Sequence, residues 1–326
     1  MRIAILGATS QIAKDLIIAF AKQGTHELAL YARRPNQVME WLKSNKLKNE
    51  CLISDLEAFS KGTNFGAILN FVGVGDPAKA IQMGGSIFDV TLKYDGLALE
   101  YVRSNPGCKY IFLSSGAAYG SAFHVPVDQF SSACISINNL QLQDWYAVSK
   151  MHAECRHRSL PELAIIDVRV FNYFSHTHDI ESRYLIADIL RAIRDDQIFK
   201  TSTQNIVRDY LHPDDFFNLI NVILTNPVSN QALDCYSRGP IDKISLLKLM
   251  SEEFNLKYEF HSEIQVTSES ELTNLTDKNS VSNLIKGKEN YYSLNKRAAN
   301  IGYFPIHNSA ECVRIESQKL LEGLSD

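Results

Sequence analysis

The segment MRIAILGATSQIAKDLIIAFAK, residues 1–22, decides the fold class of this chain. Residues 1–6 form an apolar run of strand length, Gly7 follows, and residues 14–22 repeat their apolar side chains with the period of a helix. A strand, a glycine turn and a helix in this order direct backbone N–H groups and the positive helix end at a pyrophosphate. A plain strand-turn-helix without a ligand is the alternative. The pattern predicts a dinucleotide site formed by Gly7, Thr9, Ser10, Gln11 and Ile12.

The glycine pattern of this turn is incomplete, because only the first of the usual three glycines is present. Ser10 stands where a second glycine would let the backbone approach the phosphates, and its hydroxyl could donate to a phosphate oxygen instead. Ala13 stands where a third would let the helix pack closely on the strand, and alanine is small enough for that. The dinucleotide site therefore needs support from elsewhere in the sequence.

That support comes from the end of the second predicted strand, residues 26–32. A site for NAD usually has an Asp or Glu roughly 20 residues beyond the glycines, which accepts from the ribose 2′-OH. Arg33 stands at that distance from Ala13, and Arg34 follows it. Guanidinium groups cannot accept a hydroxyl proton, but they bind a 2′-phosphate bidentately. The two arginines therefore favour NADP over NAD, with two arginines on a solvated loop as the alternative.

Further apolar runs predict the rest of the sheet. They lie at residues 51–54, 67–74, 110–113 and 164–170, and amphipathic helix-like segments separate most of them. Strands that alternate with helices predict βαβ units and a doubly wound parallel sheet of the Rossmann type, with ligands at the carboxyl ends of the strands. We therefore expect the α/β class.

After residue 170 the pattern changes and predicts a second, smaller, substrate-binding α/β lobe. Helices are predicted at 179–195, 214–224 and 245–254, and the polar segment 263–290 is predicted to be rich in loops. The dinucleotide lobe would cover residues 1–170, with about 205–235 returning to it. The substrate lobe would consist mainly of 171–204 and 236–326.

The composition is that of a soluble enzyme: 326 residues, 45% hydrophobic, with a formal net charge of −4. The slight acidity argues against a nucleic-acid partner, and no apolar stretch reaches the roughly 18 residues that a membrane span needs. The six cysteines include no C-x-x-C pair, and no secretory leader precedes the first apolar run. We expect buried thiols in a reducing cytoplasm rather than disulfides or a zinc site.

Tyr146 and Lys150 are four residues apart in the helix-compatible stretch YAVSK. On a helix this spacing puts both side chains on one face, so the ammonium can lower the pKa of the phenol from about 10. The pattern alone is common and usually marks a surface pair. Upstream, however, a buried strand runs into the sequence SSGAAYG, residues 114–120. A strand end is where such a sheet would present a hydroxyl that polarises a substrate.

Together these motifs resemble the extended short-chain dehydrogenase/reductase family, the NAD(P)-dependent nucleotide-sugar epimerases, dehydratases and reductases. The resemblance extends along nearly the whole chain and includes four further stretches. They are Asp55-Leu56, RVFNYF at 169–174, VRDYLHPDD at 207–215 and LNKRAANIGYFP at 294–305. Each stretch is weak alone, but their common order is a strong signal.

The resemblance implies the catalytic roles. Tyr146 would be the general acid and base, and Lys150 would modulate its pKa and anchor the cofactor ribose. Ser115, rather than Ser114, would hold the reacting oxygen of the substrate.

The resemblance also implies binding roles. Asp55 and Leu56 would contact the adenine, whereas Asn172 and Arg208 would contact a nucleotide-sugar substrate. Arg208 would face the diphosphate, for which a guanidinium is well suited, and an ion pair between Arg208 and Asp209 is the alternative.

Three histidines and an aspartate are not assigned to the chemistry. His212 and Asp215 are expected to be structural. His176 and His178 could suggest a metal, but no third ligand is in view, so we expect a loop and no metal site.

The residues after Ser115 narrow the reaction. The family's 4,6-dehydratases carry Asp-Glu there, whereas this chain has Gly116 and Ala117, which cannot move a proton. Because a net reductase consumes NADPH in cells, Arg33 and Arg34 favour a reductase that acts on C4 of a nucleotide-linked 4-keto-6-deoxy sugar. A nucleotide-sugar epimerase and a noncatalytic dinucleotide-binding sensor are the alternatives, and NAD remains a second choice of cofactor.

The resemblance also implies a homodimer, because family dimers pack the helix that carries Y-x-x-x-K and the preceding helix into a four-helix bundle. The corresponding segments here are residues 91–103 and 145–158. Both also carry charges, including Lys93 and Arg156, so a monomer is the alternative.

Overall fold

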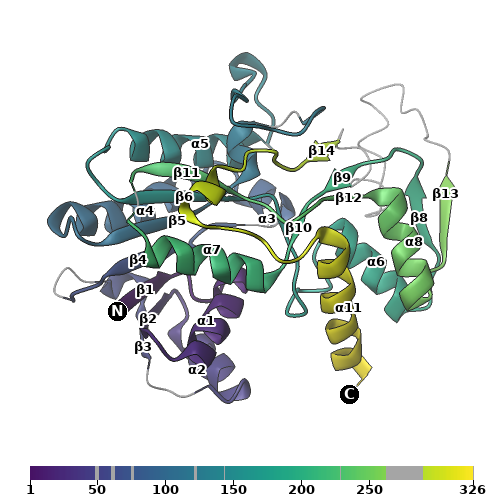
Figure 1. The fold of residues 1–326 in the computed structure, drawn as a ribbon, viewed down its shortest axis with the longest axis horizontal. Helices are drawn as coiled ribbons and strands as arrows, with labels where there is room; N and C mark the ends of the chain where they lie inside the picture. The colour runs from purple at the N-terminus through teal and green to yellow at the C-terminus, as the bar shows by residue number, and fades with distance from the viewer. Residues whose placement is uncertain are drawn as a thin grey trace.

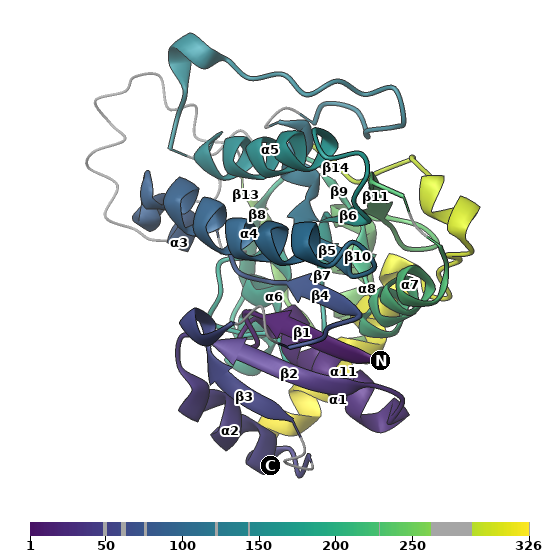
Figure 2. The same cartoon turned by 90° about the vertical axis from the view of Figure 1, so that its left-hand side faces the viewer.

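A parallel sheet of seven strands forms the centre of the larger lobe (Figure 2), in the order β11-β6-β5-β4-β1-β2-β3. The strands are β1 (Arg2–Leu6), β2 (Glu27–Ala32), β3 (Leu52–Asp55), β4 (Ala67–Asn70), β5 (Lys109–Ser115), β6 (Ile165–Val170) and β11 (Gln231–Cys235). The computed structural model describes residues 1–47, 51–59, 63–74, 77–120, 123–142, 144–227, 229–261 and 289–325. The chain crosses over between β3 and β4, so the sheet is doubly wound about β1 and β4.

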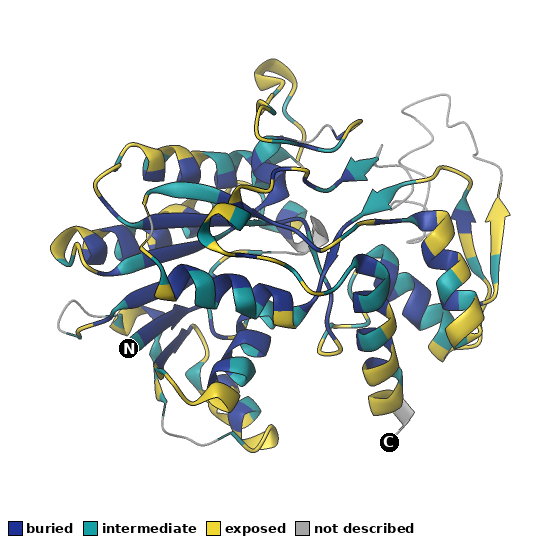
Figure 3. Cartoon of the chain, in the orientation of Figure 1, coloured by how far each residue is buried: buried dark blue, intermediate teal, exposed yellow. Residues whose placement is uncertain are grey.

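Helices cover both faces of this sheet, as the alternation of buried side chains along β1 shows. Ile3 and Ile5 pack into one apolar cluster with α1 (Gln11–Gln23), α2 (Pro35–Ser44) and α7 (Pro213–Thr225). Ala4 and Leu6 pack into a second cluster with α4 (Ser86–Ser104) and α5 (Asp144–Arg158). Strands buried on both faces are typical of parallel sheets, and Figure 3 shows the sheet as the most buried part of the larger lobe.

The smaller lobe lies beside the larger one and is built on three short sheets (Figure 1). Their strands are β7 (Asn172–Tyr173) with β10 (Tyr210–Leu211), β8 (Phe199–Ser202) with β13 (Tyr258–His261), and β9 (Val207–Arg208) between β12 (Ile241–Asp242) and β14 (Asn290–Tyr291). Its helices are α6 (Leu185–Arg194), α8 (Lys243–Phe254) and α11 (Ser309–Ser325). Their apolar faces pack together around Ile189, Leu247 and Val313.

The remaining helical elements are short. They are α3 (Pro77–Met83) and the 3-10 helices η1 (Leu56–Ala58), η2 (Gly116–Tyr119), η3 (Ile137–Asn139) and η4 (Arg297–Ile301). Residues 128–139 lie in the segment that precedes α5 and contain the 3-10 helix η3.

The predicted fold class is confirmed, and the start of one helix differs from the sequence prediction. Helix α6 begins at Leu185 rather than at 179, because the Asp179 carboxylate accepts from the backbone N–H of Glu181 and holds a turn there. Strand β9 pairs with β12 and β14, and the division of the chain into two lobes stays a prediction. The predicted loop-rich segment 263–290 lies almost wholly outside the described residues.

The cysteines differ in part from expectation. All six are free, and Cys108, Cys235 and Cys312 are buried as predicted, but Cys134 and Cys155 are exposed. Cys134 lies in the segment before α5, and Cys155 lies in α5 itself. Among the described helices, none combines the length and the apolar character that crossing a membrane requires.

Candidate active site

The turn after β1 is built so that only glycine fits its first position. Gly7 has φ +83°, and a Cβ added there would lie 2.9 Å from the backbone carbon of Phe71 and from the backbone nitrogen of Val72. The turn closes with a hydrogen bond of 2.9 Å from the Ser10 N–H to the Gly7 carbonyl, and α1 begins at Gln11. The backbone of Phe71 and Val72 therefore occupies the space that a side chain at position 7 would need. This glycine turn lies at the crossover of the sheet, where a pyrophosphate can approach the backbone closely.

The other predicted residues of this turn differ in how free they are. Thr9 is exposed, and the Ser10 side chain caps no helix N–H, so its hydroxyl is not engaged by α1. The Gln11 side chain instead donates to Ser175 Oγ at 3.0 Å, so only its backbone N–H faces the turn. Ile12 is half-buried against the apolar cluster that contains β1.

Arg33 and Arg34 follow β2 directly and are both exposed. Neither forms an ion pair with another described residue. The Asp55 carboxylate, at the end of the neighbouring strand β3, accepts from the Glu57 N–H at 2.8 Å and caps η1. Leu56 is buried in the apolar core, so its side chain supports this region from beneath and is not part of its exposed surface. The predicted cofactor residues other than Lys150 thus lie at the carboxyl ends of β1, β2 and β3.

Ser115 lies at the carboxyl end of β5, where its hydroxyl accepts from the Ala117 N–H at 3.1 Å and caps η2. The Ser115 hydroxyl also lies close enough to the Tyr146 phenol to lower its pKa, although the two residues come from different elements. Ser114, by contrast, points the other way and donates to Glu154 Oε1 at 2.6 Å. This arrangement leaves Ser115 as the hydroxyl that faces Tyr146.

Burial raises the pKa of Tyr146 above 10, and the nearby Ser115 hydroxyl offsets only part of this effect. The sequence predicted the opposite direction, because it considered only the neighbouring ammonium. The phenol is therefore protonated at neutral pH.

Lys150 is buried beside Tyr146 and lies at the end of β5. Its Nζ donates to the Leu113 carbonyl at 2.7 Å and lies 4.4 Å from the centre of the Phe112 ring and 5.9 Å from that of Tyr146. Burial lowers the pKa of Lys150 to about 8. A Cβ added at Gly73, just beyond β4, would lie 3.6 Å from Nζ, so the ammonium borders the crossover between β1 and β4.

Arg208 reaches the same region from the smaller lobe. Its guanidinium donates to the carbonyls of Val207 and Glu289, at 2.8 and 3.3 Å, and pairs with no carboxylate of the described residues. Asp209 points elsewhere and accepts from the Ser237 N–H, so the two do not form the alternative ion pair. A half-buried guanidinium with only neutral partners is suited to an anionic group of a ligand.

Tyr291 is the residue that the sequence did not predict for this site. Its hydroxyl lies 3.1 Å from Ser115 Oγ, its carbonyl accepts from Asn172 Nδ2 at 3.4 Å, and its backbone pairs with Arg208 in the sheet. The ring packs against Phe123 and Phe171, with ring centres 4.8 and 5.2 Å away. One residue therefore contacts Ser115, Asn172 and Arg208. Strand β14 is two residues long, which is too short for a periodic pattern.

Phe171 covers the start of η2. A Cβ added at Gly116 would lie 2.4 Å from two carbons of the Phe171 ring, so position 116 has no room for a side chain. Ala117 is buried beside it. Neither of the two positions that follow Ser115 therefore carries a side chain that can move a proton.

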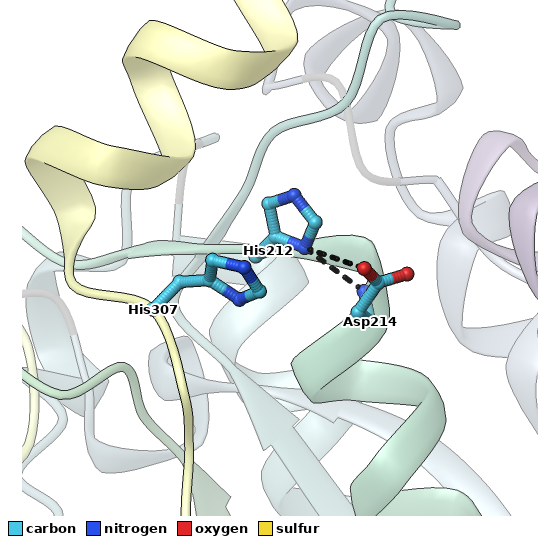
Figure 4. Close-up of side chains that lie close together, drawn as sticks. All are labelled: His212, Asp214 and His307. Atoms are coloured by element: carbon cyan, nitrogen blue, oxygen red, sulfur yellow. Dashed lines mark hydrogen bonds and ion pairs between the residues drawn. The ribbon is translucent and has the colours of Figure 1, made fainter.

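A cluster of three side chains that could bind a metal ion lies at the start of α7 (Figure 4). Ligand atoms of His212, Asp214 and His307 lie within 4.8 Å of one another. However, His212 Nδ1 already accepts from the Asp214 N–H at 3.1 Å, and the His212 and His307 rings are stacked with centres 3.9 Å apart. His212 therefore acts as a helix cap, and we assign no metal to this cluster.

The two other histidines that we considered for a metal are also engaged. His176 Nδ1 lies 2.7 Å from Glu316 Oε2, and His178 Nε2 lies 2.8 Å from Ser182 Oγ. Asp215 is buried and accepts from the N–H groups of Ile306 and His307, which ties the C-terminal segment to α7.

Residues 3–237 match the model of the NAD dependent epimerase/dehydratase family. No curated protein matches the chain in sequence. Solved structures with a similar fold include a UDP-glucose 4-epimerase from Thermotoga maritima, with a TM-score of 0.78 and 13% identity over 99% of this chain and 100% of that one.

Two further structures are similar to the same degree. A UDP-N-acetylglucosamine 4-epimerase from Methanobrevibacter ruminantium M1 has a TM-score of 0.78 and 14% identity over 99% of this chain and 98% of that one. A dTDP-glucose 4,6-dehydratase from Bacillus anthracis, solved in complex with NAD, has a TM-score of 0.74 and 14% identity over 99% of this chain and 97% of that one.

Proposed function

Because this chain belongs to the NAD-dependent epimerase/dehydratase family, we propose that it is an NADPH-dependent reductase of a nucleotide-linked 4-keto-6-deoxy sugar. The observation that carries the proposal is the exposed pair Arg33 and Arg34 at the end of β2, where an acidic residue would serve NAD. Two guanidinium groups without an ion pair among the described residues suit the 2′-phosphate of NADP. The glycine turn at Gly7 would hold the pyrophosphate.

The side chains at the end of β5 fit the protein's share of a reduction. A bound NADPH would supply the hydride. Ser115 would hold the carbonyl oxygen of the sugar through a hydrogen bond, and Tyr146 would donate the proton that this oxygen needs as it becomes a hydroxyl. The raised pKa of Tyr146 keeps its proton in place at neutral pH, which suits an acid.

The substrate would be bound by residues of both lobes. Arg208 would contact the diphosphate, because its guanidinium has only carbonyl partners among the described residues. Asn172 and Tyr291 would border the sugar. Lys150 would bind the cofactor ribose from the end of β5.

A dehydratase is not supported, because Phe171 fills the space at Gly116 where a proton-transferring side chain would have to stand. A noncatalytic sensor is less consistent with the site than an enzyme, since a sensor has no need to keep Ser115 and Lys150 close to Tyr146.

An epimerase is the second candidate, and the solved 4-epimerases with a similar fold make it the natural comparison. An epimerase must present both faces of one carbon to the nicotinamide, so its keto intermediate has to turn over within the site. Reduction on a single face has no such requirement. The exposed Arg33 and Arg34, which suit the 2′-phosphate of NADPH, favour the reductase.

The test is the loss of NADPH absorbance when purified protein meets nucleoside-diphosphate 4-keto-6-deoxy sugars. We expect turnover by the wild type and a loss of about 10²- to 10⁴-fold in kcat for Tyr146→Phe, the usual contribution of a general acid. Tyr258→Phe, a change of the same kind in the smaller lobe, is the matched control. Sugar interconversion without net loss of NADPH would instead indicate an epimerase.

A further inference from the structure

A second cavity, of about 310 Å³, lies at the outer edge of the large sheet beside β11. Its walls come from β6, β11, η2, the end of α5, the start of η4 and residues 129–133 of the segment before α5. The lining includes neither Ser115, Tyr146 nor Arg208. The cavity is therefore separate from the site described above.

The lining of this cavity is cationic. It contains the guanidinium groups of Arg158, Arg169 and Arg297 and no carboxylate. Arg297 is exposed and forms no ion pair with another described residue. Its charge is therefore available to a ligand.

The other two arginines form ion pairs with buried carboxylates. Arg158 pairs with Asp167 and Arg169 with Glu154, and these carboxylates are 0% and 7% exposed, against 35% and 19% for the arginine side chains. Arg169 also lies 3.5 Å from the buried Asp234 carboxylate, and its guanidinium lies over the Tyr119 ring. The acidic partners thus lie within the wall, and the solvent-facing side of each pair is the guanidinium. A guanidinium carries five N–H donors, and a buried carboxylate fixes its orientation while it leaves others for a ligand.

The amide side chain of Asn230 lies in the same wall, and its oxygen accepts no hydrogen bond from the described residues. Asn230 Nδ2 donates to the carbonyls of His157 and Leu160, at 2.8 and 2.7 Å. Its Oδ1 is buried and has no hydrogen-bond partner among the described residues. The two hydrogen bonds from Nδ2 fix Asn230 against the end of α5, so its side chain forms part of the rigid wall of the cavity.

We propose that this cavity is a second binding site, for a small molecule that carries both a phosphate and hydroxyl groups, of the size of a sugar phosphate. The phosphate would lie against Arg297 and the two oriented guanidinium groups, which match its oxygens bidentately. The side chains of Gln231 and Asn295 would contact the sugar hydroxyls. The volume is at the lower end of the range for small-molecule pockets, which suits one sugar ring with its phosphate.

The experiment is calorimetric titration of the NADP-saturated protein with glucose 1-phosphate, so that the dinucleotide site is already filled. We expect the wild type to bind the probe and Arg297→Gln to bind it at least about tenfold more weakly, because a charge-assisted contact is lost. Arg208→Gln should bind it as the wild type does, which separates the cavity from the sugar site. Arg103→Gln, at the exposed end of α4, is the matched control for loss of one positive charge.

Further probes report on the ligand class. Inorganic phosphate should bind more weakly than glucose 1-phosphate, and neutral glucose more weakly still, if both groups contribute. The proposal is overturned if the wild type does not bind the sugar phosphate at millimolar concentration, if Arg297→Gln binds it unchanged, or if Arg208→Gln abolishes binding. None of these results depends on turnover of a nucleotide sugar, so the proposal stands or fails independently of the reductase.

Discussion

His157 provides a quantitative test of how the catalytic helix is anchored. It lies near the end of α5, the helix that carries Tyr146 and Lys150, and is completely buried. Its Nδ1 lies 2.6 Å from Asp167 Oδ1 in β6, and its Nε2 lies 2.7 Å from Asp95 Oδ1 in α4. Carboxylates accept hydrogen bonds, so both ring nitrogens must carry protons. His157 is therefore a buried imidazolium that ties α4, α5 and β6 together.

The size of this effect follows from its pKa. Burial alone would lower the pKa of His157 below 6.5, but the hydrogen bonds with Asp167 and Asp95 outweigh burial and raise it to about 9. Because the folded state holds this proton more tightly than the unfolded state, the stabilisation is full below pH 6.5 and is lost as the pH rises through about 9. A difference of about 2.5 pH units, at 1.36 kcal/mol per unit, gives about 3 kcal/mol.

The assay is urea unfolding of the wild type and His157→Gln at pH 6.5, 8 and 9, followed by circular dichroism. We expect the difference in free energy of unfolding between the two proteins to shrink by about 3 kcal/mol from pH 6.5 to 9. The difference is the useful quantity, because Lys150 and other groups titrate equally in both proteins. A difference that stays constant over this range would refute the charged state of His157.

Three further predictions concern the site. Replacing both Arg33 and Arg34 by Ala should raise KM for NADPH at least about tenfold and leave KM for NADH unchanged. Steady-state kinetics at fixed ionic strength measure both values, and equal effects on the two cofactors would refute a 2′-phosphate contact. Gly7→Ala should lower the free energy of unfolding by about 1–3 kcal/mol and weaken dinucleotide binding, because its Cβ meets the backbone at 2.9 Å; thermal unfolding and a binding titration check this, and unchanged values would contradict it. Tyr291→Phe should change KM for the sugar and spare KM for NADPH, since its hydroxyl contacts Ser115 on the substrate side; a change in KM for NADPH alone would count against that placement.

The strands of the large sheet could be predicted from the sequence, because strands buried on both faces appear as continuous apolar runs. The runs at 1–6, 26–32 and 164–170 correspond to β1, β2 and β6 within a residue or two. The start of α6 was not predicted correctly, because the Asp179 turn depends on one side-chain hydrogen bond. The division into lobes and the dimer through α4 and α5 stay predictions.

The candidate site was predicted only in part, because burial and contacts between distant segments depend on the folded structure. Ser115 and Tyr146 lie in two motifs that can be recognised in the sequence, and the structure brings the two residues together. The pKa direction of Tyr146 was wrong, because burial depends on the surrounding fold and not on its own helix. Tyr291 and the partners of His157 come from distant segments, and no local pattern connects them to α5.

The most direct test of the central claim uses NADPH that carries deuterium at the transferable position of its nicotinamide. If the chain reduces a nucleotide-linked 4-keto-6-deoxy sugar, the product should carry that deuterium at C4, in amounts equal to the NADPH consumed. Tyr146→Phe should lower both quantities together. A product without deuterium, or sugar interconversion with no NADPH consumed, would contradict the reductase.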